Sequence, residues 1–403
     1  MKISTTVIMI AVSLLPLPTM AYDAYGTPFE GWGFVKDDWQ LVCDNTLTCR
    51  AAGYADEGLV SEEILSASIL LTVVAGEKLP SAEVILSSED YDEQEKLVSD
   101  QLSKNTDNVE LSLNDQSYGI VQFSADGKGQ LSRAQIQQLL KLANQNTKIQ
   151  FTSGIYKWQV SDKGLAAVLL KLDEVQGRIG TPLAFISKNN PNRQTPKKAL
   201  KIPIVKKDYS YLDDAALEAG KQALDPKKLA YFQANINRWV DIDSERLIGS
   251  EDGMGDCELV NPKSEASINL AEYSSNHLDW DFTPVNANYT LASHLCWRGA
   301  YNMGAGFWLI NHAKPNKPQL ITTSASDYSD GEISAFHKDR GIGDCWNSQT
   351  WVWNGKTFAM TEDSSTGMCR GFAGGAWNLP TYTSKVIKMI ARFNESYWCL
   401  SGT

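Results

Sequence analysis

The sequence predicts an α+β N-terminal domain followed by a mainly β, disulfide-stapled C-terminal domain containing two related units. Two apolar stripes at helical spacing stand among strand-like runs in the first half of the chain. Nine of the twelve Trp, five of the seven Cys and all four His lie from Trp239 onward. A Gly-x-Gly-Asp-Cys motif also occurs twice in that second half. With 403 residues, the chain is too long for one core of usual size.

Residues 1–21 have the pattern of a secretory signal peptide. Lys2 supplies the positive start, Val7 to Leu17 is an apolar run, and Thr19 to Ala21 offers small residues before a cleavage point. No later segment reaches the roughly 20 apolar residues that a spanning helix needs. We therefore expect a periplasmic or secreted protein with no transmembrane anchor.

Export changes how the cysteines are interpreted, because thiols outside the cytosol are expected to pair as disulfides. Cys43 and Cys49 lie at the facing ends of two short strand-like runs, Trp39 to Cys43 and Thr48 to Gly53. This pattern predicts a disulfide across a tight hairpin. A metal site at this pair is disfavoured because structural zinc takes four N or S ligands, and no other Cys or His lies nearby in the sequence.

Residues 22–186 are predicted to form the α+β domain. Ser68 to Val74 is its most apolar strand-like run, and Val109 to Phe123 alternates as a half-buried strand does. Ser132 is expected to cap one helix. Ser161 or Asp162 is expected to cap a second helix, which Gly177 ends.

Residues 187–208 are predicted to form a basic, Pro-containing linker. The segment from Ser187 to Lys207 has three Pro and seven Lys or Arg with no acid, which is typical of a solvated spacer. A docking site for an acidic partner is the alternative. Residues 209–240 are expected to form a helical connector, in which Asp225 and Pro226 begin a helix.

Residues 241–403 are predicted to be a mainly β domain with an internal duplication. Each copy of the Gly-x-Gly-Asp-Cys motif is followed by a Cys that precedes Arg and Gly, or Trp, Arg and Gly. The repeat predicts the disulfides Cys257–Cys296 and Cys345–Cys369, and leaves Cys399 unpaired. The acids and arginines beside these cysteines predict the ion pairs Asp256–Arg298 and Asp344–Arg370. Two acidic functional sites, one in each copy, are the alternative.

The sequence contains none of the common catalytic or cofactor-binding motifs. It lacks a nucleophile elbow, a Walker A loop, a dinucleotide-binding glycine motif after a strand, and H-E-x-x-H. Glycine-containing turns at 124–135 and 326–333 lack the calcium ligand set. We therefore expect no cofactor, no metal and no catalytic residue of a familiar kind. Paired carboxylates for glycoside hydrolysis stay an alternative, with these candidates: Glu251, Asp252, Asp279, Asp281 and Glu332.

The aromatic residues of the second domain are the stronger signal. Trp346, Trp351 and Trp353 lie beside a hairpin turn at Asn354-Gly355, and the last two share one face of a strand. They predict either a β-domain core or an exposed aromatic platform for a protein or a glycan, flanked by Asp327 and Asp330. We expect binding through this platform. The net charge of −11 disfavours nucleic acid as the partner.

These residues resemble two bacterial families. The segments Asp38 to Thr46, Cys49 to Tyr54, Gly341 to Cys345 and Trp351 to Phe358 resemble the domain of unknown function family 1176 over most of the chain. Residues 30–185 are also similar to the invasion-associated locus B proteins. The first resemblance implies an exported Gram-negative envelope protein, and the second implies host contact or envelope integrity. Neither implies a reaction or site residues.

The sequence therefore predicts an exported envelope protein that binds a protein or glycan partner in the envelope or on a host surface. Two other functions stay open. One is a carboxylate-dependent hydrolase acting on envelope glycan. The other is a structural partner of another envelope protein. An enzyme is the less favoured interpretation because the motifs above are missing.

Overall fold

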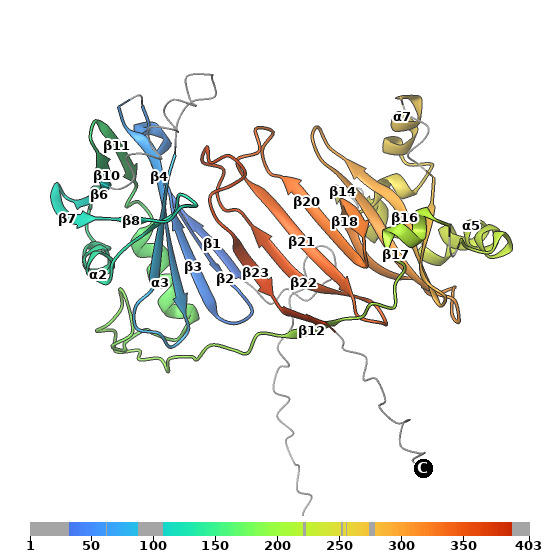
Figure 1. The fold of residues 1–403 in the computed structure, drawn as a ribbon, viewed down its shortest axis with the longest axis horizontal. Helices are drawn as coiled ribbons and strands as arrows, with labels where there is room; N and C mark the ends of the chain where they lie inside the picture. Colours follow the sequence, from blue (N-terminus) through green and yellow to red (C-terminus); the bar gives the residue numbers. More distant parts are fainter. Residues whose placement is uncertain are drawn as a thin grey trace, which may run out of the picture.

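A computed structural model describes residues 32–61, 63–87, 108–220, 223–250, 253–254, 256–273 and 279–388. The expected signal peptide, residues 1–21, and Cys399 lie outside these ranges. The chain forms an N-terminal part, residues 32–186, and a C-terminal part, residues 209–388, with sheets in both (Figure 1). Among the described residues, no helix is long and apolar enough to cross a membrane.

The N-terminal part is one mixed sheet of eleven strands with two helices. Its main order is β1-β2-β3-β4-β11-β10-β6-β7, and β5 pairs with β4 and with β9. The strand bounds are β1 Trp32–Lys36, β2 Trp39–Cys43, β3 Thr48–Gly53, β4 Leu65–Val74, β5 Ser81–Leu86, β6 Glu110–Leu113, β7 Gln116–Ile120, β8 Gln122–Phe123, β9 Gly129–Gln130, β10 Ile149–Ser153 and β11 Tyr156–Val160.

Two helices pack their apolar stripes against this sheet and form its core. Helix α2, Arg133–Leu142, begins with the predicted cap: Ser132 and Gln135 make a reciprocal capping box. Helix α3, Leu165–Val175, begins differently from the prediction, because Gly164 occupies the cap position without a side-chain hydrogen bond. A Cβ at Gly164 would lie 1.9 Å from the Lys36 carbonyl oxygen, and its φ of +99° also favours glycine.

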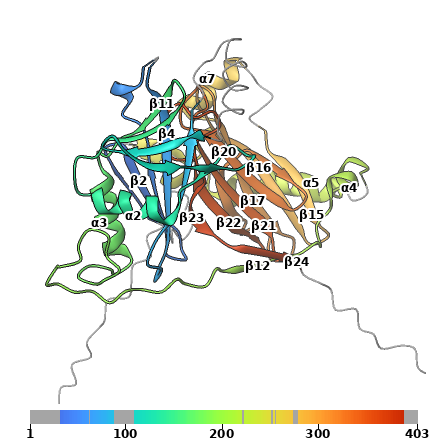
Figure 2. The ribbon, with the colours of Figure 1, turned by 60° about the vertical axis from the view of Figure 1, so that its left-hand side comes forward.

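The basic segment after α3 is not a free spacer. Main-chain hydrogen bonds from Lys197 to Gln176, from Ala199 to Ala75 and from Leu200 to Thr46 hold it along the N-terminal part. It then forms β12, Ile204–Lys207, which pairs in parallel with β24, Lys385–Lys388. Figure 1 shows this segment running along one edge of the molecule, and Figure 2 shows the β12–β24 pair at the edge of the C-terminal sheets.

The C-terminal part contains two antiparallel sheets. The first has β15 Asp281–Asn286, β16 Tyr289–Arg298, β17 Met303–Asn311 and β18 Gln319–Ala325 in sequence order. The second has β19 Asp327–Ser329, β20 Glu332–Lys338, β21 Trp346–Trp353, β22 Phe358–Ser365 and β23 Leu379–Thr383, also in sequence order. One apolar cluster contains residues of both sheets, from Val285 to Phe358.

Short helices pack on the first of these sheets. Asp225 caps α5, Pro226–Val240, as predicted, and α5 buries Phe232 and Ile236 against β16 and β17. The remaining elements are η1 Glu57–Leu59, α4 Asp214–Glu218, α6 Glu245–Ile248, β13 Gly249–Ser250, β14 Gly253–Met254, η3 Glu258–Val260 and α7 Glu265–Tyr273.

All three predicted disulfides are confirmed: Cys43–Cys49, Cys257–Cys296 and Cys345–Cys369. The duplication itself stays a prediction, because the two motif copies have different surroundings. Cys257 precedes the short helix η3, whereas Cys345 directly precedes strand β21. Cys296 lies within β16, whereas Cys369 lies in the loop after β22.

A fourth apolar cluster joins the two parts of the chain. Tyr54 and Leu70 of the N-terminal part pack in it with Phe372, Trp377 and Leu379 of the C-terminal part. The Trp377 indole donates to the Ser68 hydroxyl at 2.7 Å. The two predicted domains are therefore joined by a buried contact.

A candidate binding surface in the C-terminal part

Trp351 and Trp353 are core residues, so the prediction that they form an exposed platform is wrong. Both are almost fully buried in the cluster between the two C-terminal sheets. Trp351 lies opposite Ile333 on the neighbouring strand, and Trp353 packs against Tyr289 at 5.1 Å between ring centroids. The shared strand face was predicted correctly, but the adjacent sheet covers that face.

Trp346 is the only one of the three predicted tryptophans with a partly exposed side chain. It lies five residues before Trp351, so strand alternation turns it to the other face of β21. Its indole donates to the Gly343 carbonyl at 2.9 Å, and the Lys338 ammonium lies 5.2 Å from the ring centroid. This geometry is a cation–π contact.

The predicted acidic residues do not lie beside Trp346. Asp330 is in the turn before β20, whereas Trp346 pairs with Lys338 at the far end of that strand. Six residue steps at ~3.3 Å separate the ends of β20 by about 20 Å. Asp327 is exposed on β19, and Asp330 and Asp214 each accept a hydrogen bond from the other's main-chain N–H.

Four other large apolar residues are exposed on the segments around Trp346. We call this group the apolar surface: Tyr301, Met303, Phe336 and Ile342, which are 50%, 56%, 54% and 60% exposed. It lies where the β16–β17 connection meets the end of β20 and the loop before β21.

Hydrogen bonds between the two sheets hold the apolar surface together. The Asn302 amide donates to the Lys338 carbonyl at 2.7 Å and accepts from the Lys338 N–H at 3.0 Å. The Tyr301 hydroxyl donates to the Asp339 carbonyl at 3.2 Å. Below them, the Trp297 and His337 rings lie 5.0 Å apart.

Asp344 fixes the loop that carries Ile342. Its carboxylate is fully buried, accepts from the Arg340 guanidinium, and accepts from the Gly371 N–H at 2.8 Å. Burial alone would raise the pKa of Asp344, but the Arg340 and Gly371 hydrogen bonds lower that pKa below its usual value. The neighbouring Cys345–Cys369 disulfide ties the same loop to residue 369.

The ion pairs predicted from the repeat are wrong. Asp344 pairs with Arg340, and Arg370 instead donates to Asp38 of the N-terminal part at 3.0 Å. Asp256 lies 3.9 Å from Arg246. Arg298 is exposed at the end of β16, directly opposite Met303 in the sheet register. The spacing of the motif showed where the cysteines pair, but it did not determine which charged groups meet.

Groups that suggest a metal site have other roles. Asp339 lies close to Cys345 and Cys369, but both sulfur atoms are in the disulfide and cannot act as thiolate ligands. His294, His312 and His337 bind separate main-chain oxygens of Leu295, Ala287 and Ser324. His277 lies outside the described residues.

The candidate carboxylates for glycan hydrolysis within the described residues lie in or just before strands of different C-terminal sheets. Glu251 and Asp252 lie outside the described residues. Asp279 is exposed two residues before β15, and Asp281 is the exposed first residue of β15 in the first C-terminal sheet. Glu332 begins β20 in the second sheet and lies 3.6 Å from Lys207.

A family model now identifies the chain. The model for DUF1176, described as a protein of unknown function, matches residues 34–384. The chain belongs to the DUF1176 family. The match includes both parts and the contact between them, so the DUF1176 region is larger than either predicted domain. A search of curated proteins and a search of solved structures found no match.

The sequence contained signals for the apolar surface of this DUF1176 protein. Ile333 and Ala335 face the core, so alternation along β20 turns Phe336 outward. Ile342 stands between two glycines in a loop, where a large apolar side chain has little neighbouring chain to cover it. The contact between the β16–β17 connection and Asp339 is long-range and had no sequence signal.

Proposed function

We propose that this DUF1176 protein is an exported envelope protein that binds a protein partner through the apolar surface. The observation that supports this most strongly is the grouping of four large apolar side chains that are each at least half exposed. Single exposed apolar residues are common, but several large ones on segments that meet point to an interaction site.

The composition of the surface favours a protein partner over a glycan. Tyrosine, phenylalanine, tryptophan, methionine and arginine are enriched in protein interfaces. The surface and its rim contain each of these residue types, including the half-buried Trp346 and the exposed Arg298 and Arg340. Arg298 lies opposite Met303 in the sheet register, and Arg340 lies two residues before Ile342.

The surface is also held in one conformation before binding. Asn302 and Tyr301 connect the two sheets, and Asp344 fixes the loop of Ile342. A preorganised surface loses less conformational entropy on association. The three disulfides support an oxidising compartment, which agrees with export.

The test compares three forms of the mature chain as bait in envelope extract. The first is wild type and the second is Phe336→Ser with Ile342→Ser. The third is a matched control, Ile155→Ser with Leu59→Ser, which removes two exposed apolar side chains from the N-terminal part. Near-UV dichroism and thermal unfolding establish that all three are folded.

We expect wild type and the control to retain the same specific partner, and the Phe336/Ile342 variant to lose at least 10-fold in affinity for it. This corresponds to ~1.4 kcal/mol or more, which is typical of hot-spot residues. Equal binding by all three forms, with folding intact, would exclude this surface. Release of product from peptidoglycan by wild type would favour the hydrolase instead. Sedimentation shows whether the partner is a second copy of the chain.

A further inference from the structure

The N-terminal part contains a cavity whose lining residues are distant in sequence from the apolar surface. It has a volume of about 370 Å³, within the range of small-molecule sites. It lies between helix α2 and the strip of residues 182–188 that follows α3. Leu79, at the approach to β5, contributes to its lining.

Apolar, amide and cationic side chains all line the cavity. Leu79, Leu140, Leu183, Phe185 and Ile186 provide half-buried apolar side chains. Three exposed lysines stand around it: Lys78, Lys141 and Lys188. Gln137 and Asn144 add amide groups.

These three lysines differ from others in the same part of the chain. Lys148, Lys163 and Lys171 pair with Asp115, Asp56 and Glu174. No ion pair to an acidic side chain is found for Lys78, Lys141 or Lys188 within the described ranges. The cavity therefore keeps a positive rim on a protein with a net charge of −11.

A buried polar network holds the wall of the cavity in place. The fully buried Asp173 carboxylate accepts hydrogen bonds from the N–H groups of Phe185, Ile186 and Ser187, at 2.9, 2.9 and 3.3 Å. The fully buried Arg178 donates to the Leu183 carbonyl at 3.1 Å, and its guanidinium carbon lies 5.0 Å from the Phe185 ring centroid.

Burying these charges is costly, and apolar residues of the same volume would often be at least as stable. The network instead specifies one conformation of residues 183–187. A ligand that enters the cavity meets a wall that is already ordered, which lowers the entropy cost of binding.

We propose that this cavity binds a monomeric anionic amphiphile, with an acid anion at the lysine rim and a short hydrocarbon tail against the apolar wall. Lysine ammonium groups bind carboxylate or phosphate as point charges and need no fixed bidentate geometry. The half-buried leucines and Phe185 would gain by covering a tail.

The test is calorimetric titration of the full mature chain with four small probes: octanoate, octyl phosphate, 1-octanol and acetate. Octanoate or octyl phosphate should bind saturably at one site, with a dissociation constant at or below about 1 mM. The tighter-binding of these two probes identifies the preferred head group, carboxylate or phosphate. 1-Octanol tests the tail without the charge, and acetate tests the charge without the tail. Both 1-octanol and acetate should bind at least 10-fold more weakly than the tighter-binding octyl anion.

Two variants and a control locate the site. The double variant Lys78→Gln/Lys141→Gln should weaken anion binding about 5- to 10-fold, because each exposed ion pair contributes a modest amount. Asn144→Trp should obstruct the cavity and abolish binding. Lys314→Gln, at an exposed position in the C-terminal part, should have no effect.

Three results would overturn the proposal. One is no saturable binding of either anionic amphiphile by the folded wild type. Another is binding that both the lysine and the Asn144 variants leave unchanged. The third is binding to anionic phospholipid vesicles without binding to the monomeric probes, which would indicate a membrane surface instead.

Discussion

Asp344 shows how one buried carboxylate organises two loops. It accepts hydrogen bonds from Arg340 on one side and from Gly371 on the other, and residue 371 follows the arginine that contacts Asp38. From the sequence we predicted an arginine partner for Asp344 and expected it to be Arg370, whereas the structure shows Arg340. Arg340 lies only four residues before Asp344 on the same loop, so the local chain geometry places its guanidinium beside the carboxylate.

Asp344→Asn tests that role through pH. The folded-state pKa of Asp344 lies below the value near ~3.9 expected for an unfolded chain, so the carboxylate stabilises the fold above that pH. This contribution is lost as the pH falls through the folded-state pKa. We expect Asp344→Asn to lower the free energy of unfolding by about 1–2 kcal/mol at pH 7.

The measurement is urea unfolding of wild type and Asp344→Asn between pH 7 and pH 2. The difference between them should shrink below pH ~4. A difference that stays constant, or grows, toward low pH would contradict the assigned charge interaction. Asp327→Asn, at an exposed position, is the control.

Trp351 and Trp346 provide a second residue-scale prediction. Trp351→Ala should lower the free energy of unfolding by ~3–5 kcal/mol, because it opens a cavity in a buried cluster. Trp346→Ala removes a half-exposed ring and should cost ~1–2 kcal/mol, mainly through the Lys338 contact. Chemical denaturation measures both losses. Equal losses of unfolding free energy in the two variants would contradict the assignment of Trp351 and Trp346 to different faces.

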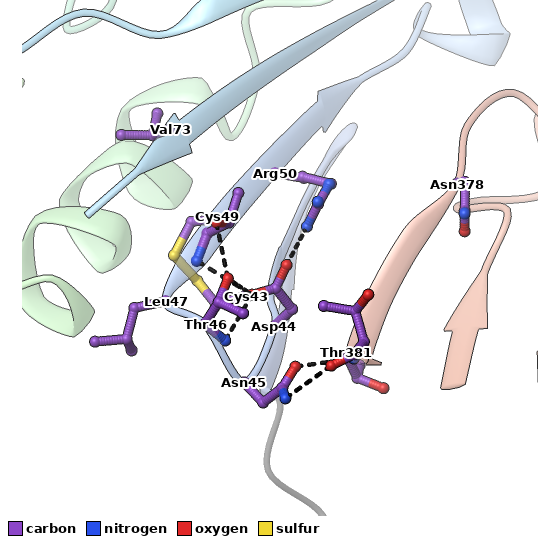
Figure 3. Close-up of polar contacts among 12 residues, drawn as sticks. Cys43, Asp44, Asn45, Thr46, Leu47, Cys49, Arg50, Val73, Asn378 and Thr381 are labelled. Atoms are coloured by element: carbon purple, nitrogen blue, oxygen red, sulfur yellow. Dashed lines mark hydrogen bonds and ion pairs between the residues drawn. A yellow bond between two sulfur atoms is a disulfide. The ribbon is translucent and has the colours of Figure 1, made fainter. Parts of the chain in front are cut away.

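At the scale of elements, the Cys43–Cys49 hairpin was fully predictable because its disulfide and strands are local in sequence. Its contact with β23 was not predictable. The Asn45 side chain makes two hydrogen bonds with the main chain of Thr383, at 3.0 and 2.8 Å. Figure 3 shows Asn45 at the hairpin turn, pointing toward the strand that carries Thr381. Asn45 and Thr383 are 338 positions apart, so no pattern of periodicity relates them.

Asn45→Ala should release the end of β23. Loss of two partly buried hydrogen bonds is expected to cost about 1–2 kcal/mol. Hydrogen exchange should show faster exchange of the amides at 381–384, with little change in the strands of the first C-terminal sheet. Asn192→Ala, at an exposed position of the linker, should leave exchange in β23 unchanged. Faster exchange spread evenly over the molecule would indicate general destabilisation instead.

At the scale of the whole molecule, the sequence predicted the three disulfides but not the contact between the N-terminal and C-terminal parts. Composition distinguishes the Trp- and Cys-rich second half from the first. It does not show that Tyr54 and Trp377 meet in one apolar cluster. The prediction of an exposed platform at Trp351 and Trp353 was wrong for a related reason. Sheet alternation predicts which side chains share a face, but the neighbouring sheet decides which face is covered.

The shared cluster predicts cooperative unfolding. We expect wild type to give one calorimetric transition, because the parts bury Trp377 and Leu70 against each other. Trp377→Ala removes the indole that fills this contact and donates to Ser68, so the transition should broaden or split into two. Two separate transitions in wild type would show that the parts unfold independently.

The central claim is that the apolar surface contacts a protein partner. The most direct measurement places the photocrosslinker benzoyl-phenylalanine at position 342, with position 155 as a matched exposed apolar control, and irradiates intact cells. The proposal predicts one discrete protein adduct from position 342 and none from position 155. The same adducts from both positions, or none from position 342 with the protein folded and exported, would contradict it.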